Sequence, residues 1–140
     1  MLNIYSNIDP SKLLHKIVYL EDFEKGRVEI IKPDQFIQCA ALNMDKGKTF
    51  KPHFHLWKES DKDDMTIAQE SWHVIKGSVK CIFYDIDNSC LGSWILRKGD
   101  TSFSLYGGHN YEVLEDETFV LEYKTGPYLG QELDKAFINE

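Results

Sequence analysis

The stretch from Glu70 to Ile86, ESWHVIKGSVKCIFYDI, contains two runs of apolar and aromatic residues separated by Lys76-Gly77. β-Branched and aromatic residues favour strands, and a short connection that contains glycine favours a tight hairpin. Because so short a connection joins strands that lie side by side, the stretch predicts an antiparallel pair. The same alternation of apolar runs and turn residues continues on both sides of it.

From about residue 27 onward the chain therefore reads as a series of short strands. Turn residues such as Asp87-Asn88 and Lys98-Gly99-Asp100 separate them. The series predicts an all-β fold, an antiparallel sandwich or barrel. The predicted strands are Arg27–Ile31, Gln35–Asn43, Thr49–Leu56, Glu70–Lys76, Ser78–Ile86, Leu91–Arg97, Thr101–Tyr106, Tyr111–Leu114 and Thr118–Tyr123.

Helical spacing of apolar residues occurs only near the ends, over Gly130–Phe137 and Ser11–Val18. We expect the segment 1–26 to pack on the barrel. The polar stretch Trp57–Ala68, WKESDKDDMTIA, interrupts the strands and predicts an exposed insertion, or an excursion over the end of the barrel. No linker or repeat divides the chain, so one domain over 1–140 is expected.

Composition restricts the class of protein. The 140 residues are 42% hydrophobic and 13% aromatic, enough for one sizeable core. No apolar run approaches the roughly 18 to 20 residues of a membrane span, and the N-terminus lacks a signal-peptide pattern, so we expect a cytoplasmic protein without a membrane partner. Cys39, Cys81 and Cys90 lack the spacing of a disulfide framework or a thiolate metal site, which predicts buried free thiols.

The charge balance argues against nucleic acid as a partner. The net charge is −7, and residues 112–140 hold eight acidic residues against two lysines. No cluster of basic residues offers a phosphate-binding surface. A small-molecule ligand is the expected partner.

His53 and His55 are the first candidates for chemistry. Residues i and i+2 of a strand point to the same face, so these two imidazoles lie side by side. Glu70 on an adjacent strand and His109 on a later one can reach the same inner face. Three imidazoles and one carboxylate are typical ligands of a divalent transition metal such as Zn, Mn, Fe or Ni.

The spacing around these residues resembles the two motifs of the cupin family. Five residues separate Gly47 from His53, and six separate Glu70 from Gly77. The run from Gly99-Asp100 to Gly107-Gly108-His109 is similar to the second motif, with Leu105 where the family usually has proline. The resemblance covers residues 36 to about 130. It implies a small single-domain cupin, an antiparallel β-barrel of jelly-roll type, with His53, His55, Glu70 and His109 around one divalent metal.

One departure leaves the carboxylate ligand open. Fourteen residues separate His55 from Glu70, more than is usual in the family, whereas Glu59 has the usual distance. We prefer Glu70 because it begins an apolar strand, while Glu59 lies among charged residues of the insertion. The other histidines have ordinary explanations: His73 has the opposite parity to Glu70, and His15 is a surface or interface residue.

Strand parity also predicts the pocket wall. Trp72 and Val74 share the face of Glu70, Tyr111 shares that of His109, and Lys51 and Trp57 share that of the two histidines. Trp72, Tyr111 and Trp57 are the predicted substrate contacts, and Tyr111 and Lys51 are weak candidates for a catalytic base. The opposite face carries Phe50, Pro52, Phe54 and Leu56, which must be covered by the N-terminal strands or another subunit. A homodimer is therefore predicted.

The segment from Glu115 to Lys135, EDETFVLEYKTGPYLGQELDK, resembles the end of the cupin domain of type II mannose-6-phosphate isomerases, most distinctively at Tyr128-Leu129-Gly130. This resemblance implies sugar or sugar-phosphate chemistry, an isomerase or epimerase. Two alternatives stay open: an Fe(II)-dependent dioxygenase, and a non-catalytic module that binds a carbohydrate or a metal.

Overall fold

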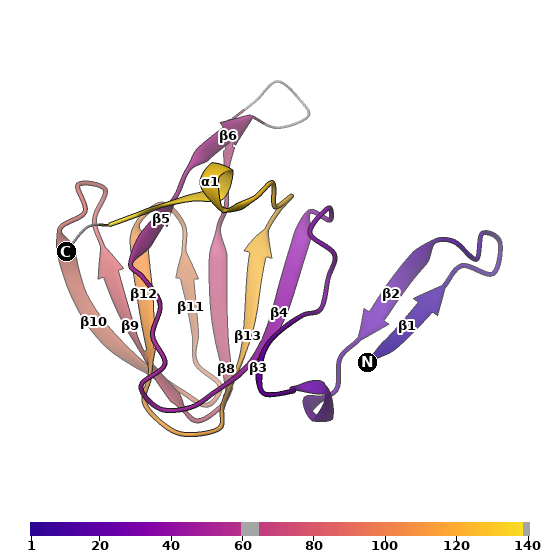
Figure 1. Ribbon diagram of the computed structural model, residues 1–140, viewed down its shortest axis with the longest axis horizontal. Helices are drawn as coiled ribbons and strands as arrows, with labels where there is room; N and C mark the ends of the chain where they lie inside the picture. Colours follow the sequence, from indigo (N-terminus) through magenta and orange to yellow (C-terminus); the bar gives the residue numbers. More distant parts are fainter. Residues whose placement is uncertain (60–64, 139–140) are drawn as a thin grey trace.

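Two five-stranded antiparallel sheets face each other in the computed structural model, which describes residues 1–59 and 65–138 (Figure 1). The first sheet has the order β10 (Cys90–Arg97), β9 (Ser78–Tyr84), β12 (Gly108–Val113), β5 (His53–His55), β14 (Lys135–Phe137). The second has the order β11 (Thr101–Ser104), β8 (Glu70–Lys76), β13 (Thr118–Thr125), β4 (Ile37–Met44), β3 (Gly26–Glu29). The all-β prediction is confirmed, and each predicted strand has a counterpart.

The predicted strand Thr49–Leu56 is shorter than expected. Its regular part is only β5, His53–His55, and Thr49 forms a single isolated bridge with Glu112. Pro52, immediately before β5, has no backbone N–H to donate, so a regular ladder cannot run through it. The side-chain alternation expected along the whole stretch therefore holds only within β5.

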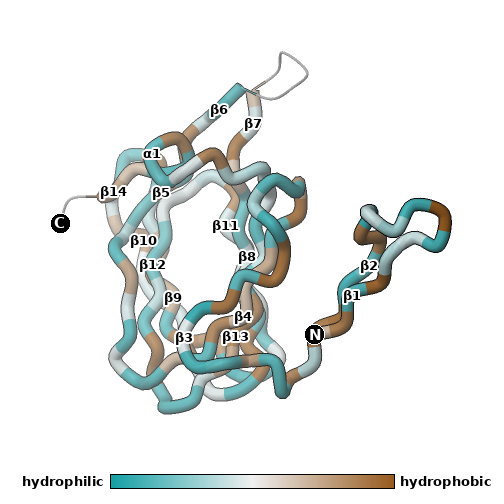
Figure 2. Tube along the Cα trace, turned by 45° about the vertical axis from the view of Figure 1, so that its right-hand side comes forward, coloured by the Kyte–Doolittle hydropathy of each residue, from teal (hydrophilic) through white to brown (hydrophobic). Residues whose placement is uncertain are grey.

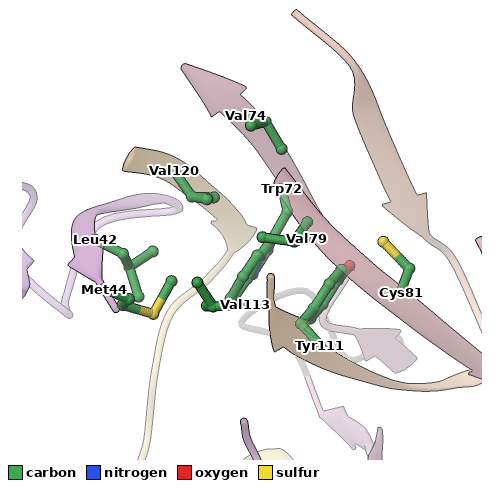
Figure 3. Close-up of a cluster of buried hydrophobic side chains, with 9 residues drawn as sticks. All are labelled: Leu42, Met44, Trp72, Val74, Val79, Cys81, Tyr111, Val113 and Val120. Carbon is green, nitrogen blue, oxygen red and sulfur yellow. The ribbon is translucent and has the colours of Figure 1, made fainter. Parts of the chain in front are cut away.

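The space between the sheets changes character along the strands. The inner face of the second sheet shows this in three consecutive rows across β8, β13 and β4. The first row is Val74, Val120 and Leu42, the second is Trp72, Glu122 and Ala40, and the third is Glu70, Lys124 and Gln38. The valine row belongs to the buried core, and the next rows turn polar. The core comprises Leu42, Met44, Trp72, Val74, Val79, Cys81, Tyr111, Val113 and Val120 (Figure 3). One end of the barrel is thus filled with apolar side chains, and the other end is left for polar groups.

The N-terminal segment divides into two parts. β1 (Leu2–Tyr5) and β2 (Leu13–Ile17) form an antiparallel hairpin that projects from the barrel (Figures 1 and 2). The following residues run through η1 (Leu20–Asp22), and Val18 and Phe23 pack on the outer face of the second sheet. Packing on the barrel, expected for the whole segment 1–26, is seen for this second part.

The helix predicted over Ser11–Val18 is wrong, because these residues mainly form β2. β1 supplies their backbone hydrogen-bond partners, and no neighbouring surface in the described part of the chain receives the apolar stripe that a helix would present. At the other end, α1 is a single turn, Gln131–Asp134, and residues predicted to continue it form β14, which pairs with β5. The fold gains a strand beside the two histidines instead of a longer helix.

The insertion begins and ends as a two-stranded ribbon. β6 (Trp57–Glu59) pairs with β7 (Met65–Ile67) beyond the end of the barrel. Residues 60–64, which include the acidic centre of the insertion, lie outside the described residues. No helix among the described residues is long and apolar enough to cross a membrane.

Candidate metal centre

Four buried side chains converge from three strands that are distant in sequence. β5 contributes His53 and His55, the start of β8 contributes Glu70 from the opposite sheet, and β12 contributes His109. His109 is directly opposite His53 in the pairing of β12 with β5. One potential ligand atom from each of the four residues can be chosen so that all lie within 4.8 Å of one another. The structure thus brings together the four predicted ligands.

The carboxylate of Glu70 lies between two imidazoles. Its Oε2 is 3.4 Å from Nε2 of His55, and its Oε1 is 3.4 Å from Nε2 of His109. The ring centroids of His53 and His109 are 4.5 Å apart. Glu59 lies on β6 and is exposed, so Glu70 is the carboxylate that reaches the histidines.

Among the described residues, the histidine nitrogens around the cluster make no hydrogen bond, although the Glu70 oxygens lie 3.4 Å from two of them. Nε2 of His53, Nε2 of His55 and both ring nitrogens of His109 are buried and unpartnered. Nδ1 of His53, in contrast, donates a hydrogen bond to the backbone oxygen of Lys51 at 2.9 Å. In the neutral ring Nε2 then carries no proton and has a lone pair available. Buried polar atoms without partners are rare in folded proteins. A divalent metal fits this donor set, since it would use the nitrogens that the protein leaves unpaired.

The protonation states also suit a cation. Burial lowers the pKa of His53 to about 3, helped by the nearby charges of His109 and Lys135, so this imidazole is neutral at pH 7. Burial opposes a charge on His55, but the neighbouring carboxylates of Asp134 and Glu70 outweigh it and raise its pKa. The histidines outweigh the burial of Glu70 and hold the pKa of its carboxyl well below the usual range. A metal would replace the proton shared among these groups.

Asp134 is a functional residue that the sequence reasoning missed. It ends α1, is 1% exposed, and places Oδ2 3.4 Å from Nδ1 of His55. Its backbone oxygen lies 3.3 Å from the same nitrogen. Two lysines hold the carboxylate: Lys58 Nζ at 3.2 Å and Lys124 Nζ at 3.0 Å. An acceptor at Nδ1 fixes the imidazole with Nε2 toward the metal, as in the carboxylate–histidine–metal arrangement of many metalloproteins.

A cavity of about 340 Å³ opens from the metal centre between the sheets. Trp72 and Tyr111 form part of its wall and stack face to face, with ring centroids 4.0 Å apart. The indole Nε1 of Trp72 donates to Glu70 at 3.1 Å and to Glu122 at 3.2 Å. The complete wall is Arg27, Glu29, Ile31, Pro33, Gln38, Phe50, His53, Glu70, Trp72, Tyr111, Glu122, Lys124, Tyr128 and Lys135.

Lys51 and Trp57, predicted to share the inner face with the two histidines, do not line this cavity. Lys51 is exposed with its Nζ over the ring of Phe137, and Trp57 is 56% exposed and stacks on Tyr106. Both residues lie outside the three-residue strand β5, and the alternation of side chains between the two faces does not continue beyond its ends. Phe50, expected on the outer face, lines the cavity instead and meets Trp72 edge to face.

The structure also places the remaining residues singled out from the sequence, Tyr111, Val74, His73 and His15. Tyr111 is 2% exposed and its hydroxyl lies 2.9 Å from that of Ser102, and burial, together with Glu70, raises the pKa of the phenol. Val74 belongs to the apolar core. His73 does not join the cluster, and its Nδ1 forms a hydrogen bond of 2.7 Å with Oγ1 of Thr101. His15 lies on the exposed hairpin.

The three cysteines are free thiols, and Cys39 and Cys81 are buried as predicted, but Cys90 is exposed. Burial raises the pKa of Cys39 to about 11 and that of Cys81 to about 12. Neither is a thiolate at neutral pH.

Comparison with known proteins places the fold. No family model matches the chain, and no curated protein matches its sequence. A solved structure of CapF with the inhibitor 3-isopropenyl-tropolone has a TM-score of 0.64 at 18% identity, over 84% of this chain and 33% of that one. An uncharacterized protein with a double-stranded β-helix domain from Klebsiella pneumoniae gives 0.62 at 13% identity, over 91% and 100% of the two chains. KdgF from Halomonas sp. gives 0.53 at 18%, over 71% and 76%.

These likenesses show that the chain has the double-stranded β-helix, or cupin, fold. The identities are too low to transfer an activity, and this chain spans only a third of the CapF chain. Within this fold, the buried histidine–glutamate cluster is a group that could hold a metal ion.

Proposed function

We propose that this protein is a metal-dependent enzyme acting on a small polar hydroxycarbonyl compound, an isomerase or epimerase of a sugar or sugar phosphate. The observation that carries the proposal is that two residues of the histidine–glutamate cluster, His53 and Glu70, form part of the wall of a cavity between the sheets. A metal held by His53, His55, Glu70 and His109 would therefore be accessible to a ligand in that cavity. Open positions are the mark of a catalytic metal site as opposed to a structural one.

A divalent metal bound there would polarise a carbonyl oxygen and stabilise an enediolate of the substrate. The protein supplies the rest of the site. The stacked Trp72 and Tyr111 rings, with Phe50 beside them, give an apolar wall against which the carbon face of a sugar can lie. Because burial keeps the Tyr111 phenol protonated, this residue can donate a hydrogen bond or a proton to a substrate oxygen but is not poised to accept one.

A non-catalytic binding module is the second candidate. Of the two weak base candidates, Lys51 lies outside the cavity, and Tyr111 holds its proton. Both oxygens of Glu122, another carboxylate in the wall, already accept hydrogen bonds from Arg27. A site that binds a sugar without moving its proton would keep the same geometry.

The first test is elemental analysis of the purified protein beside a folded His53→Ala/His109→Ala variant. We expect about one metal per chain in the parent and almost none in the variant, and release from the parent at pH 4, where protons compete for the imidazoles. Retention of tightly bound metal at pH 4, or equal metal in both proteins, would contradict the centre.

The second test is exchange in D2O of the proton next to the substrate carbonyl, at C2 of an aldose or C1 of a ketose. It is followed by NMR with metal-loaded protein over a panel of aldoses, ketoses and their phosphates. Incorporation of deuterium, lost in the variant, supports the isomerase. Binding without exchange favours the binding module, and oxygen consumption with Fe(II) favours the dioxygenase.

A further inference from the structure

The cations around the cavity differ in whether a carboxylate neutralises them. Arg27 donates to both oxygens of Glu122, at 2.9 and 2.7 Å, and also pairs with Glu29. Lys124 and Lys58 share Asp134. Lys135 lines the cavity, and among the residues that the structure describes no carboxylate pairs with it. Within that part of the chain it is the free ammonium group of the wall.

The position of Lys135 directs this ammonium toward the metal centre. Lys135 begins β14, lies opposite His55 in the pairing with β5, and shares the cavity wall with His53 and Glu70. Its charge is close enough to contribute to the lowered pKa of His53. A ligand that reaches the open side of the metal therefore also comes within the field of Lys135.

Apart from the histidines, the positively and negatively charged side chains at this end of the barrel are equal in number before a metal is added. Four cations, Lys58, Lys124, Lys135 and Arg27, stand among four carboxylates, Glu29, Glu70, Glu122 and Asp134. A divalent cation bound by Glu70 and neutral imidazoles adds two positive charges that no described side chain neutralises. In a partly buried cavity such an excess is costly unless an anion enters.

We infer that the cavity takes a small anionic ligand, a sugar acid or sugar phosphate, whose charged group pairs with Lys135 while its hydroxyl or carbonyl oxygens face the metal ligands. This inference rests on the proposed function, since it assumes the divalent metal. The volume of about 340 Å³ is at the small end of ligand pockets and suits a single sugar unit. The anion, and not the sugar ring alone, sets the affinity.

The test is calorimetric titration of Mn²⁺-loaded protein with three probes: gluconate, glucose 6-phosphate and neutral glucose. We expect at least one of the two anions to bind about tenfold more tightly than glucose, as a charge-assisted hydrogen bond allows. Which anion binds separates a carboxylate ligand from a phosphate ligand. If neither anion binds more tightly than glucose to protein with a full metal content, the inference is overturned and the metal site stands.

Two variants assign the effect to one side chain. Lys135→Met should lose the preference for the anion, whereas Lys135→Arg should retain most of it, with the Mn²⁺ content of both unchanged. Lys51→Met is the matched control, since Lys51 is an exposed lysine near the same strand but outside the cavity. Full anion affinity in Lys135→Met would overturn the role of Lys135. Absence of bound metal in the parent would overturn the proposed function together with this inference.

Discussion

The aspartate behind His55 shows how one residue prepares a metal ligand. The carboxylate of Asp134 is buried, yet its pKa is lowered, because His55 and Lys124 outweigh the cost of burial. It therefore stays ionised and holds His55 in one orientation. A rigid imidazole loses little freedom when it binds a metal, which favours affinity.

We expect Asp134→Asn to weaken metal affinity by about 10- to 100-fold, the usual effect of removing such a partner. A competition titration against a chromophoric chelator measures this, and circular dichroism checks the fold, because the change leaves Lys58 and Lys124 without their carboxylate. Glu132→Gln, on the same helical turn but exposed, is the control and should bind as the parent does. Parent-like affinity in Asp134→Asn would remove Asp134 from the centre.

Among the elements, the hairpin of β8 and β9 depends on its turn glycine. Gly77 has φ of +80°, a conformation that L residues rarely adopt, and a Cβ there would lie 2.3 Å from Oγ1 of Thr118. The buried Thr118 is the first residue of β13, which pairs with β8. The turn thus needs glycine for its backbone and for the close approach of the next strand.

Gly77→Ala should lower the free energy of unfolding by about 2 kcal/mol or more, from the left-handed backbone and the contact with Thr118 together. Gly99→Ala provides the comparison, because Gly99 also has positive φ, +91°, but a Cβ at Gly99 would meet no described atom within 4 Å. It should cost only about 1 to 2 kcal/mol. Urea unfolding of the metal-free proteins measures both, and equal losses would show that Thr118 moves aside freely.

For the whole molecule, the exposed apolar surface bears on the homodimer, which stays a prediction. The strand face that first suggested it carries less weight, since Phe50 turns into the cavity. A different groove, on the outer face of the second sheet, is lined by exposed side chains. Phe36, Ile37, Phe103 and Leu105 are each more than half exposed there. A surface of this kind is normally covered in solution.

We expect light scattering to give twice the chain mass of 16.3 kDa across a dilution series. Phe103→Glu should convert the dimer to a monomer, because it places a charge in the apolar groove. Ile86→Glu, at a residue 85% exposed outside the groove, should leave the mass unchanged. A monomer at every concentration of the parent would refute the dimer, and a dimer that survives Phe103→Glu would place its interface elsewhere.

The sequence by itself determined the strands and the four candidate metal ligands, because both rest on local regularities. Alternation with a period of two puts His53 and His55 on one face and gives Glu70 and Trp72 a common side. Glycine and Asp-Asn turns mark where strands end. The apolar run after Glu70 favoured Glu70 over Glu59 as the carboxylate ligand, and the structure places Glu70 in the cluster.

Only the tertiary structure decided what surrounds those ligands. Asp134 and Lys135 lie about eighty residues after His55 in a segment without strand periodicity, and they reach it because β14 closes the first sheet against β5. Lys51 and Trp57 leave the inner face because regular pairing stops at the ends of β5. Ser11–Val18 carries a helical pattern but pairs with β1. Local pattern fixes the direction of a side chain within an element, whereas its neighbours depend on contacts between segments that are distant along the chain.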